Sequence, residues 1–292
     1  MSRAEGSMRW FRAPAKVNLT LRVVGRRADG YHELDSLVAF AGFCDWLGFE
    51  PGDDLTLEVT GPGAGDTGPI HENLVLRAAR SLAGQIPGLR LGRFRLVKRL
   101  PAAAGLGGGS ADAAAALRLL ANEAGLSVDD PRVRASAGAT GADVLACLSP
   151  QARTIRGIGD ELGPAIRLPN IFALLVNPRV HAPTPKVFAA FDLTSEPNAG
   201  RSSPAAGFEM SPASDFGSLG CNDLETAAIQ VAPVIAAVLK RLAQIPTARA
   251  TGMSGSGATC FALFSDRRGA AAARRTVAAE HPQWWVEATD LH

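Results

Sequence analysis

Apolar and polar positions follow two different periods along the chain, and the change of period separates expected strands from expected helices. Alternating or β-branched stretches predict strands at residues 11–24, with a turn at 13–16, and at 37–40, 54–59, 93–98, 171–176 and 259–264. Helical spacing predicts helices at residues 73–83, 111–124, 131–137, 187–191, 233–243 and 268–280. Residues 62–68 and 195–216, rich in glycine or in serine and proline, are expected to form loops. We place a boundary after residue 162, which gives domains 1–162 and 163–292.

A glycine-rich run joins the strand at 93–98 to the helix at 111–124 and predicts an anion-binding loop. It comprises Pro101, Ala102, Ala103, Ala104, Gly105, Leu106, Gly107, Gly108, Gly109, Ser110 and Ala111. Glycines can turn their backbone N–H groups inward around an anion, and the first turn of the following helix adds unpaired donors and a positive dipole end. Ser110 is expected at the N-cap or in the first turn, and Gly125 at the C-terminal end. The alternative is a flexible linker without a ligand.

A second glycine-rich run, residues 252–258, precedes the strand at 259–264. Each half of the chain therefore contains one such loop. This arrangement predicts that the two loops form two walls of one cleft.

Composition and charge restrict the class of protein. With 292 residues, 47% of them hydrophobic, the chain can bury a sizeable core. A formal net charge of +2 gives no overall electrostatic case for a nucleic-acid partner, and no apolar run approaches the roughly 20 residues of a membrane span. The four cysteines lack Cys-x-x-Cys spacing, which disfavours zinc, and Cys260 is expected in the core. We expect a cytoplasmic protein without a membrane or nucleic-acid partner.

Lysine is rare among the basic residues, which singles out the lysines beside motifs. Of 30 basic residues four are lysines, and Lys16 and Lys98 adjoin a predicted turn and the first glycine-rich run. An ammonium group can offset charge on a phosphate or a reacting oxygen, and Asp143, in a Gly-Ala-Asp turn, could accept a hydroxyl proton. Phosphoryl transfer requires a loop that binds the phosphates, a cation that offsets their charge and a base for the attacking hydroxyl. The chain offers a candidate for each. The ordinary alternatives are a solvated lysine and an aspartate that caps a helix.

Aromatic residues predict a site for a planar base. Tyr31, the one tyrosine of the chain, adjoins His32 after a turn, and a Pro-Thr-Pro segment at 183–185 could present Phe188 rigidly. The alternative is that Tyr31 packs at the start of a strand with its hydroxyl in water.

Together these motifs resemble the GHMP kinase superfamily. The segments that carry the resemblance are Pro14–Asn18, Arg27–Leu34, the loop at 101–111, Gly141–Val144, Pro183–Pro185 and Met253–Gly257. It implies a two-domain α+β fold, with an N-terminal ATP-binding domain like domain 2 of ribosomal protein S5 and a C-terminal ferredoxin-like α/β sandwich. The stretches at 29–32 and 183–185 point to those members that use ATP to phosphorylate the 2-hydroxyl of a cytidine-diphosphate-linked methylerythritol in non-mevalonate isoprenoid synthesis.

The resemblance also implies a role for each matching residue. Asp143 would be the catalytic base and Lys16 its electrostatic partner. The ATP-binding residues would be Asn73, Lys98 and every residue from Pro101 to Ala111. The substrate-binding residues would be Asn18, Tyr31, His32, Thr184, Pro185, Phe188, Gly255 and Ser256. The cytosine would lie between two aromatic rings, those of Tyr31 and Phe188. Mg²⁺ would bridge the ATP phosphates, with Ser110 as its candidate protein ligand.

Two other functions remain open on the sequence. One is a GHMP kinase that acts on another small alcohol, such as homoserine or mevalonate; the other is a nucleotide-binding regulatory module without catalysis, against which the presence of Lys16 and Asp143 argues. Leu145 stands where the family usually has proline, and residues 1–8 have no counterpart and are expected to form a tail. We expect the chain to act as a monomer or a homodimer.

Overall fold

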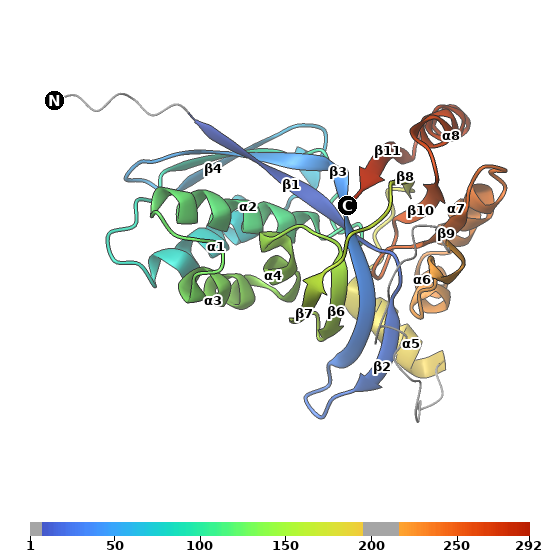
Figure 1. The fold of residues 1–292 in the computed structure, drawn as a ribbon, viewed down its shortest axis with the longest axis horizontal. Coiled ribbons are helices and arrows are strands. Elements are labelled where there is room, and N and C mark those ends of the chain that lie inside the picture. Colours follow the sequence, from blue (N-terminus) through green and yellow to red (C-terminus); the bar gives the residue numbers. More distant parts are fainter. Residues whose placement is uncertain (1–7, 195–215) are drawn as a thin grey trace. The chain divides into compact units, whose positions relative to one another are not determined.

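The computed structural model describes residues 8–194 and 216–292, which form two compact units (Figure 1). The first unit comprises residues up to 15, 44–102 and 107–150, and the second comprises residues 16–43, 103–106 and 151 onwards. The chain passes between units within strands β1 (Arg9–Asn18) and β3 (His32–Glu50). The units therefore interleave along the chain, and the boundary after residue 162 stays a prediction. The expected tail at 1–8 and loop at 195–216 lie, except for their last residues, outside the described residues.

The first unit combines a small sheet with helices. Its elements are parts of β1 and β3, β4 (Thr56–Thr60), β5 (Arg93–Val97), α1 (Leu74–Ala83), α2 (Gly108–Glu123), α3 (Pro131–Thr140) and α4 (Ala142–Leu148), with 3₁₀ turns at Ala64–Asp66 and Ile70–Glu72. Strand β4 runs parallel to β5, and β5 pairs antiparallel with β3 from Trp46↔Val97 to Glu50↔Arg93.

The sheet of the first unit has one apolar and one polar face. In β5, Phe94 and Leu96 are buried, whereas Arg95 is exposed and its Nε lies 3.0 Å from Glu58 Oε2. The ring centroids of Phe49 and Phe94 are 4.8 Å apart. Side chains of a strand point alternately to its two faces, so this alternation buries one face of the sheet.

Helix α2 is the buried helix of the first unit. Every residue from Ala111 to Leu117 is buried, and α2 contacts α1, α3 and α4. Alanine favours the helix and is small enough for neighbouring helices to approach closely. The helix starts at Gly108, earlier than predicted, and ends as predicted before Gly125, whose φ of 69° suits glycine.

The second unit contains a larger set of strands with helices on them. Its elements are the remaining parts of β1 and β3, β2 (Arg22–Arg26), β6 (Arg153–Gly157), β7 (Glu161–Ala165), β8 (Ile171–Asn177), β9 (Ala250–Met253), β10 (Cys260–Phe264), β11 (Trp285–Leu291), α5 (Thr184–Thr194), α6 (Glu225–Val231), α7 (Val234–Ala243) and α8 (Arg267–Glu280), with a 3₁₀ turn at Phe216–Ser218.

Strand β8 organises the sheet of the second unit. It pairs antiparallel with both β10 and β11, and β10 pairs antiparallel with β9. Strand β11 also meets β3 at Leu291↔Ala41. The N-terminal part of β3 pairs with β2 and β6, and β6 forms an antiparallel pair with β7.

The hydrophobic core of the second unit is formed by side chains of the sheet and of the helices that pack against it. Leu174 and Val176 of β8 belong to one buried cluster with Ile235 of α7 and Val277 of α8. Cys260 is fully buried in the same cluster, as expected. Burial of these apolar side chains supplies the main stabilisation of the unit.

The α+β fold class is confirmed, and most differences from prediction are in the number of elements. The turn predicted at 13–16 is wrong, because β1 continues through these residues, which are buried in the strand. The predicted strands at 93–98, 171–176 and 259–264 and the predicted helices at 73–83, 233–243 and 268–280 are present. The helix expected at 187–191 starts earlier, at Thr184, and the strand expected at 37–40 is part of the much longer β3. The unpredicted elements are β6, β7, β9, β11, α4 and α6. None of the described helices has both the length and the apolar character needed to span a membrane.

Candidate active site

Two glycine-rich segments contact each other in the second unit. The hydroxyl of Ser254 donates a hydrogen bond to the carbonyl oxygen of Gly105 (2.8 Å), and the N–H of Thr259 donates to the carbonyl oxygen of Ala104 (3.2 Å). Gly105 has a φ of 74°, and a Cβ there would lie 2.4 Å from the Ser254 carbonyl oxygen and 2.8 Å from that of Gly257. Only glycine fits this backbone and this space. Residues 103–106 of the predicted ATP loop are thus built against the second glycine-rich loop.

The end of β1 lies against the same two segments. The N–H of Lys16 donates to the carbonyl oxygen of Leu106 (2.8 Å), and the N–H of Asn18 donates to Ser254 Oγ (3.1 Å). The Asn18 side chain donates through Nδ2 to Ser36 Oγ (2.7 Å). Both Lys16 and Asn18 are buried, with about one-twentieth of their surface exposed (6% each). The structure therefore brings these two predicted site residues to the glycine-rich loops.

The second glycine-rich loop is held from two sides. The hydroxyl oxygens of Thr184 and Ser256 lie 2.8 Å apart within hydrogen-bonding distance. Asn222 Nδ2 donates to the carbonyl oxygens of Met253 and Gly255, each at 2.8 Å. Gly255, with a φ of 58°, takes a left-handed conformation that favours glycine. Three of the predicted substrate-binding residues, Thr184, Gly255 and Ser256, are thereby gathered around one loop.

An aromatic cluster joins the start of β3 to α5. The ring of His32 stacks on Phe188, with centroids 4.6 Å apart and an interplanar angle of 22°, and His32 Nε2 lies 2.6 Å from Asp192 Oδ1. Tyr31 precedes His32 and is 62% exposed, and Pro185 is the second residue of α5. The ring that lies against Phe188 in the structure is therefore that of His32.

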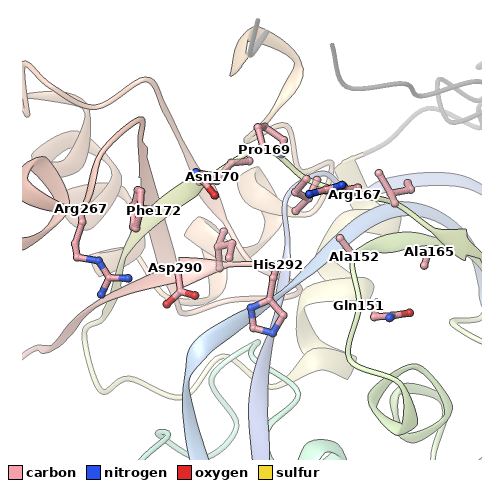
Figure 2. Close-up of a pocket in the computed structure, with 14 residues that line it drawn as sticks. Gln151, Ala152, Ala165, Arg167, Pro169, Asn170, Phe172, Arg267, Asp290 and His292 are labelled. Carbon is pink, nitrogen blue, oxygen red and sulfur yellow. The ribbon is translucent and has the colours of Figure 1, made fainter. Parts of the chain in front are cut away.

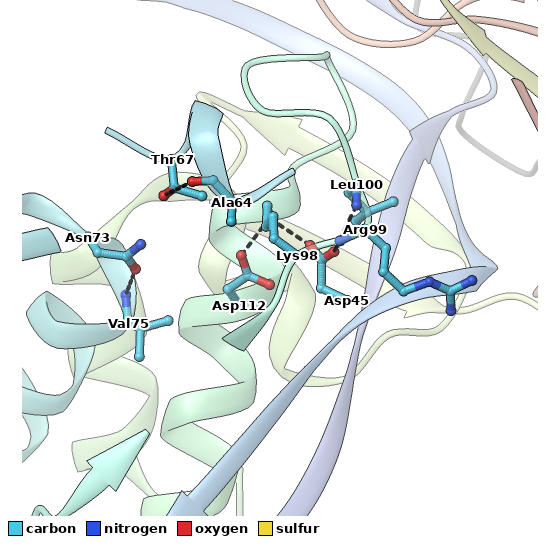
Figure 3. Close-up of polar contacts among 9 residues, drawn as sticks. All are labelled: Asp45, Ala64, Thr67, Asn73, Val75, Lys98, Arg99, Leu100 and Asp112. Carbon is cyan, nitrogen blue, oxygen red and sulfur yellow. Dashed lines mark hydrogen bonds and ion pairs between the residues drawn. The ribbon is translucent and has the colours of Figure 1, made fainter. Parts of the chain in front are cut away.

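The first unit holds the other predicted ATP-binding residues. Asn73 caps α1, since its side-chain oxygen accepts from the N–H of Val75 (3.0 Å) (Figure 3). The N-cap of α2 is Gly107, with a φ of 60° and no side-chain cap, so the expectation that Ser110 caps the helix is wrong. This helix start requires a left-handed backbone, which glycine adopts without steric cost and serine does not. Ser110 lies in the first turn of α2, the second of the two positions expected for it.

Lys98 follows β5 directly and is buried between two carboxylates (Figure 3). Its Nζ lies 2.6 Å from Asp45 Oδ2 and 2.6 Å from Asp112 Oδ2, and the three side chains are at most 4% exposed. Burial alone lowers the pKa of Lys98, but the charges of Asp112 and Asp45 outweigh it, so the pKa is raised. Burial, together with the charge of Asp45, raises the pKa of Asp112 above its usual range. Its Oδ1 is buried without a hydrogen-bond partner among the described residues.

The two predicted catalytic residues belong to different units. Asp143 lies in the first turn of α4, after Gly141, and is partly exposed, whereas Lys16 lies in β1. Their catalytic roles stay predictions.

A cavity of about 600 Å³ lies elsewhere in the second unit (Figure 2). It is lined by residues 151–152, 165–172, 267 and 290–292. The Arg267 guanidinium lies 5.3 Å from the ring centroid of Phe172 on its wall. No sequence-predicted site residue lines this cavity.

Sequence reasoning missed four polar residues that contact predicted site residues: Asp45 and Asp112, which contact Lys98, Asp192, which contacts His32, and Asn222, which contacts Gly255. Asp45 interrupts the apolar run of β3, and Asp112 interrupts the alanines of α2. A charged residue inside an otherwise apolar stretch is the signal that could have identified these two, because such residues are rarely buried without a partner. Asp192 and Asn222 carry no comparable local signal.

The chain matches both domains of the GHMP kinases. Residues 73–151 match the N-terminal domain of GHMP kinases and residues 211–283 match the C-terminal domain of GHMP kinases. A 4-diphosphocytidyl-2-C-methyl-D-erythritol kinase of Methylorubrum extorquens (strain PA1) is 53% identical over 284 residues, which cover 96% of this chain and 98% of the relative.

Solved structures show the same relationship. A crystal structure of 4-(cytidine 5'-diphospho)-2C-methyl-D-erythritol kinase superposes with a TM-score of 0.76 at 33% identity, covering 97% of this chain and 99% of that one. Homoserine kinase from Cytophaga hutchinsonii superposes with a TM-score of 0.71 at 20% identity, covering 99% and 96%, which shows a shared fold. The chain belongs to the 4-diphosphocytidyl-2-C-methyl-D-erythritol kinase family of the GHMP kinases.

Proposed function

We propose that this protein transfers the γ-phosphoryl group of ATP to the 2-hydroxyl of 4-diphosphocytidyl-2-C-methyl-D-erythritol, a step of non-mevalonate isoprenoid biosynthesis. The observation that carries the proposal is the 53% identity, over 96% of the chain, to a relative named as the kinase of this compound. The geometry of the second unit supports it, because the cluster around His32 offers what a nucleobase requires.

The cytosine is assigned to this cluster. Phe188 provides a flat apolar face, and the bond from His32 Nε2 to Asp192 leaves Nδ1 for the base. Tyr31, 62% exposed, is available to cover the opposite face of a bound cytosine. The His32 ring now stacks on Phe188. If the base binds between the rings of Tyr31 and Phe188, the His32 ring must move off Phe188 or cover only part of it.

The phosphate groups are assigned to the glycine-rich loops. Backbone N–H groups at residues 101–111 and at the start of α2 suit the ATP phosphates, since a helix N-terminus favours anions. The paired hydroxyls of Thr184 and Ser256 suit the phosphate end of the alcohol substrate. Asn18 would hold the substrate beside them, and Asn73 would contact the adenine.

The chemical step is assigned to Asp143 and Lys16. Asp143 would accept the proton of the 2-hydroxyl as its oxygen attacks the γ-phosphorus, and the bond to the β,γ-bridging oxygen breaks to release ADP. Lys16 would offset the negative charge that develops on the transferring group.

Mg²⁺ would accompany ATP. The phosphate oxygens of ATP are ligands of the kind that Mg²⁺ prefers. The hydroxyl of Ser110 is the hard oxygen donor that the first turn of α2 offers. Bound Mg²⁺ neutralises phosphate charge during transfer.

The test is turnover with defined alcohols. Purified protein with ATP and Mg²⁺ is expected to convert the cytidyl substrate to its 2-phosphate, which phosphorus NMR distinguishes from a phosphate at another hydroxyl. Homoserine and mevalonate serve as matched alternatives, since homoserine kinase shares the fold. Turnover of these alone would reassign the substrate, and ATP binding without any transfer would favour a regulatory module. A cytoplasmic location and a monomeric or homodimeric state are part of the proposal; fractionation and light scattering test them.

A further inference from the structure

The buried ion network around Lys98 lies next to the predicted ATP loop, and the mechanism above does not use it. Figure 3 shows the Lys98 side chain between Asp45 of β3 and Asp112 of α2. An ammonium group has three N–H donors, and two of them are taken by these carboxylates. With 3% of its surface exposed, Lys98 has little access to a nucleotide.

Asp45 fixes the segment that enters the loop. Its Oδ1 accepts hydrogen bonds from the backbone N–H groups of Arg99 and Leu100, the latter at 2.8 Å, while its Oδ2 accepts from Lys98. One fully buried carboxylate thus binds three successive residues immediately before Pro101.

Asp112 fixes the segment that leaves the loop. It lies one turn into α2, and a Cβ placed on Gly108 would lie 3.2 Å from Lys98 Nζ. The ammonium therefore packs against the first residue of α2 and bonds to its next turn. Removing these three charges from water costs free energy that their mutual attraction need not recover. Stability alone therefore does not explain why this network is buried here, and a role in shaping the adjoining loop does.

We propose that Asp45, Lys98 and Asp112 are positioning residues for ATP: their network fixes the two segments on either side of residues 103–106, and Lys98 does not itself contact the nucleotide. The proposal rests on the ATP-dependent function above. It moves Lys98 from the ATP-binding set predicted by sequence to a supporting role.

The decisive variants are Asp45→Asn and Asp112→Asn. Each keeps the side-chain shape and leaves one lysine–aspartate pair, so no buried charge loses its last partner. Each is expected to raise the KM for ATP at least roughly tenfold, because a charge-assisted hydrogen bond is worth about that factor. The KM for the alcohol substrate should change less than threefold.

A direct contact between Lys98 and ATP would give the opposite result. Loosening the ammonium from Asp112 would then make it more available to a phosphate, and Asp112→Asn would leave the KM for ATP unchanged or lower it. Under direct contact, affinity for ATP would fall only in the triple variant Lys98→Met, Asp45→Asn, Asp112→Asn, which removes all three charges, and not in the single Asp→Asn variants. Either result would overturn the proposal, as would a parallel rise of both KM values.

Binding of ATP without the alcohol separates this proposal from the proposed function. The rise in melting temperature with ATP concentration reports affinity whether or not transfer occurs. A smaller rise for Asp112→Asn than for wild type supports the positioning role even if the alcohol is not a substrate. Lys240→Met, at an exposed position of α7, is the control and should leave the nucleotide response unchanged.

Discussion

Ser254 and Gly105 are joined by a hydrogen bond from a side-chain hydroxyl to a backbone carbonyl oxygen, 2.8 Å long, although they lie 149 positions apart in the sequence. The same hydroxyl oxygen accepts from the N–H of Asn18, so one serine connects the end of β1, the first glycine-rich segment and the second. These contacts predict the effects of substitutions at Gly105 and Ser254.

Replacing Gly105 by alanine should damage both stability and ATP binding. The left-handed backbone and the close carbonyl oxygens of Ser254 and Gly257 together are expected to cost about 3 kcal/mol or more. Gly125→Ala is the matched control, because Gly125 has a similar φ of 69° but nothing lies within 4 Å of an added Cβ. It should cost about 1 kcal/mol. Urea unfolding measures the free energy of unfolding of both variants. An equal decrease in the two would show that the backbone moves to relieve the close contacts of an added Cβ at residue 105.

Replacing Ser254 by alanine should lower the free energy of unfolding and weaken substrate binding. The N–H of Asn18 and the carbonyl oxygen of Gly105 would each lose a partner in a buried place, which is expected to cost about 1–3 kcal/mol. Thr276→Ala removes a hydroxyl from the exposed surface of α8 and should cost less than about 0.5 kcal/mol. Equal midpoints of urea unfolding for the two variants would contradict this account.

Asp143→Asn should abolish most turnover while ATP still binds. A positioned base contributes about 10²–10⁴-fold to rate, so kcat should fall by that factor. The amide keeps the shape of the carboxylate but cannot take up the proton. Asp129→Asn, at an exposed position before α3, is the control and should have normal kcat. Near-normal turnover of Asp143→Asn would remove this residue from the mechanism.

Tyr31→Ala should act on the cytidyl substrate alone. Loss of stacking on the base is expected to weaken substrate binding by about 1–3 kcal/mol, with the KM for ATP unchanged. Tyr31→Phe keeps the ring and should bind as wild type does. Calorimetric titration with the cytidyl compound measures both, and an unchanged affinity of Tyr31→Ala would leave the exposed ring with a packing role only.

The cysteines should differ sharply in reactivity. Cys221 is exposed, whereas Cys44, Cys147 and Cys260 are buried, and burial raises the pKa of the Cys260 thiol far above its usual range. A raised pKa keeps the thiol protonated at pH 8, and the protonated form is not the nucleophile. Titration of the native protein with a thiol reagent is therefore expected to give one fast equivalent, and all four thiols after denaturation. A fast reaction at Cys260, mapped by mass spectrometry, would show that this core opens readily.

Local pattern predicted the elements that have a strong period of their own. Strand β10 and helices α2 and α8 have clear periodicity or composition, and their burial follows from it. Strand β3 was mostly missed because Asp35, Gly42 and Asp45 break its apolar pattern, and only its pairing with several strands shows why it extends over 19 residues. Tertiary pairing decides such cases over propensity.

The site shows the same limit. Motifs were sufficient to name Lys16, Asn18 and Ser256, which the structure gathers around the glycine-rich loops. They could not predict that residues 103–106 belong to the second unit, because that depends on Ser254 and Thr259, distant in sequence. Nor could they distinguish a lysine that binds phosphate from one buried between two carboxylates.

The bond between Ser254 and Gly105 also sets an order of events during synthesis of the chain. A ribosome adds about 5–20 residues per second, so Gly105 is made roughly 7–30 seconds before its partner, 149 positions later, exists. A nascent chain that stops after α4 therefore carries both flanks of the loop but not the contacts that shape its centre. Competence to bind nucleotide should consequently arrive late in translation, when the region around residue 254 has left the exit tunnel.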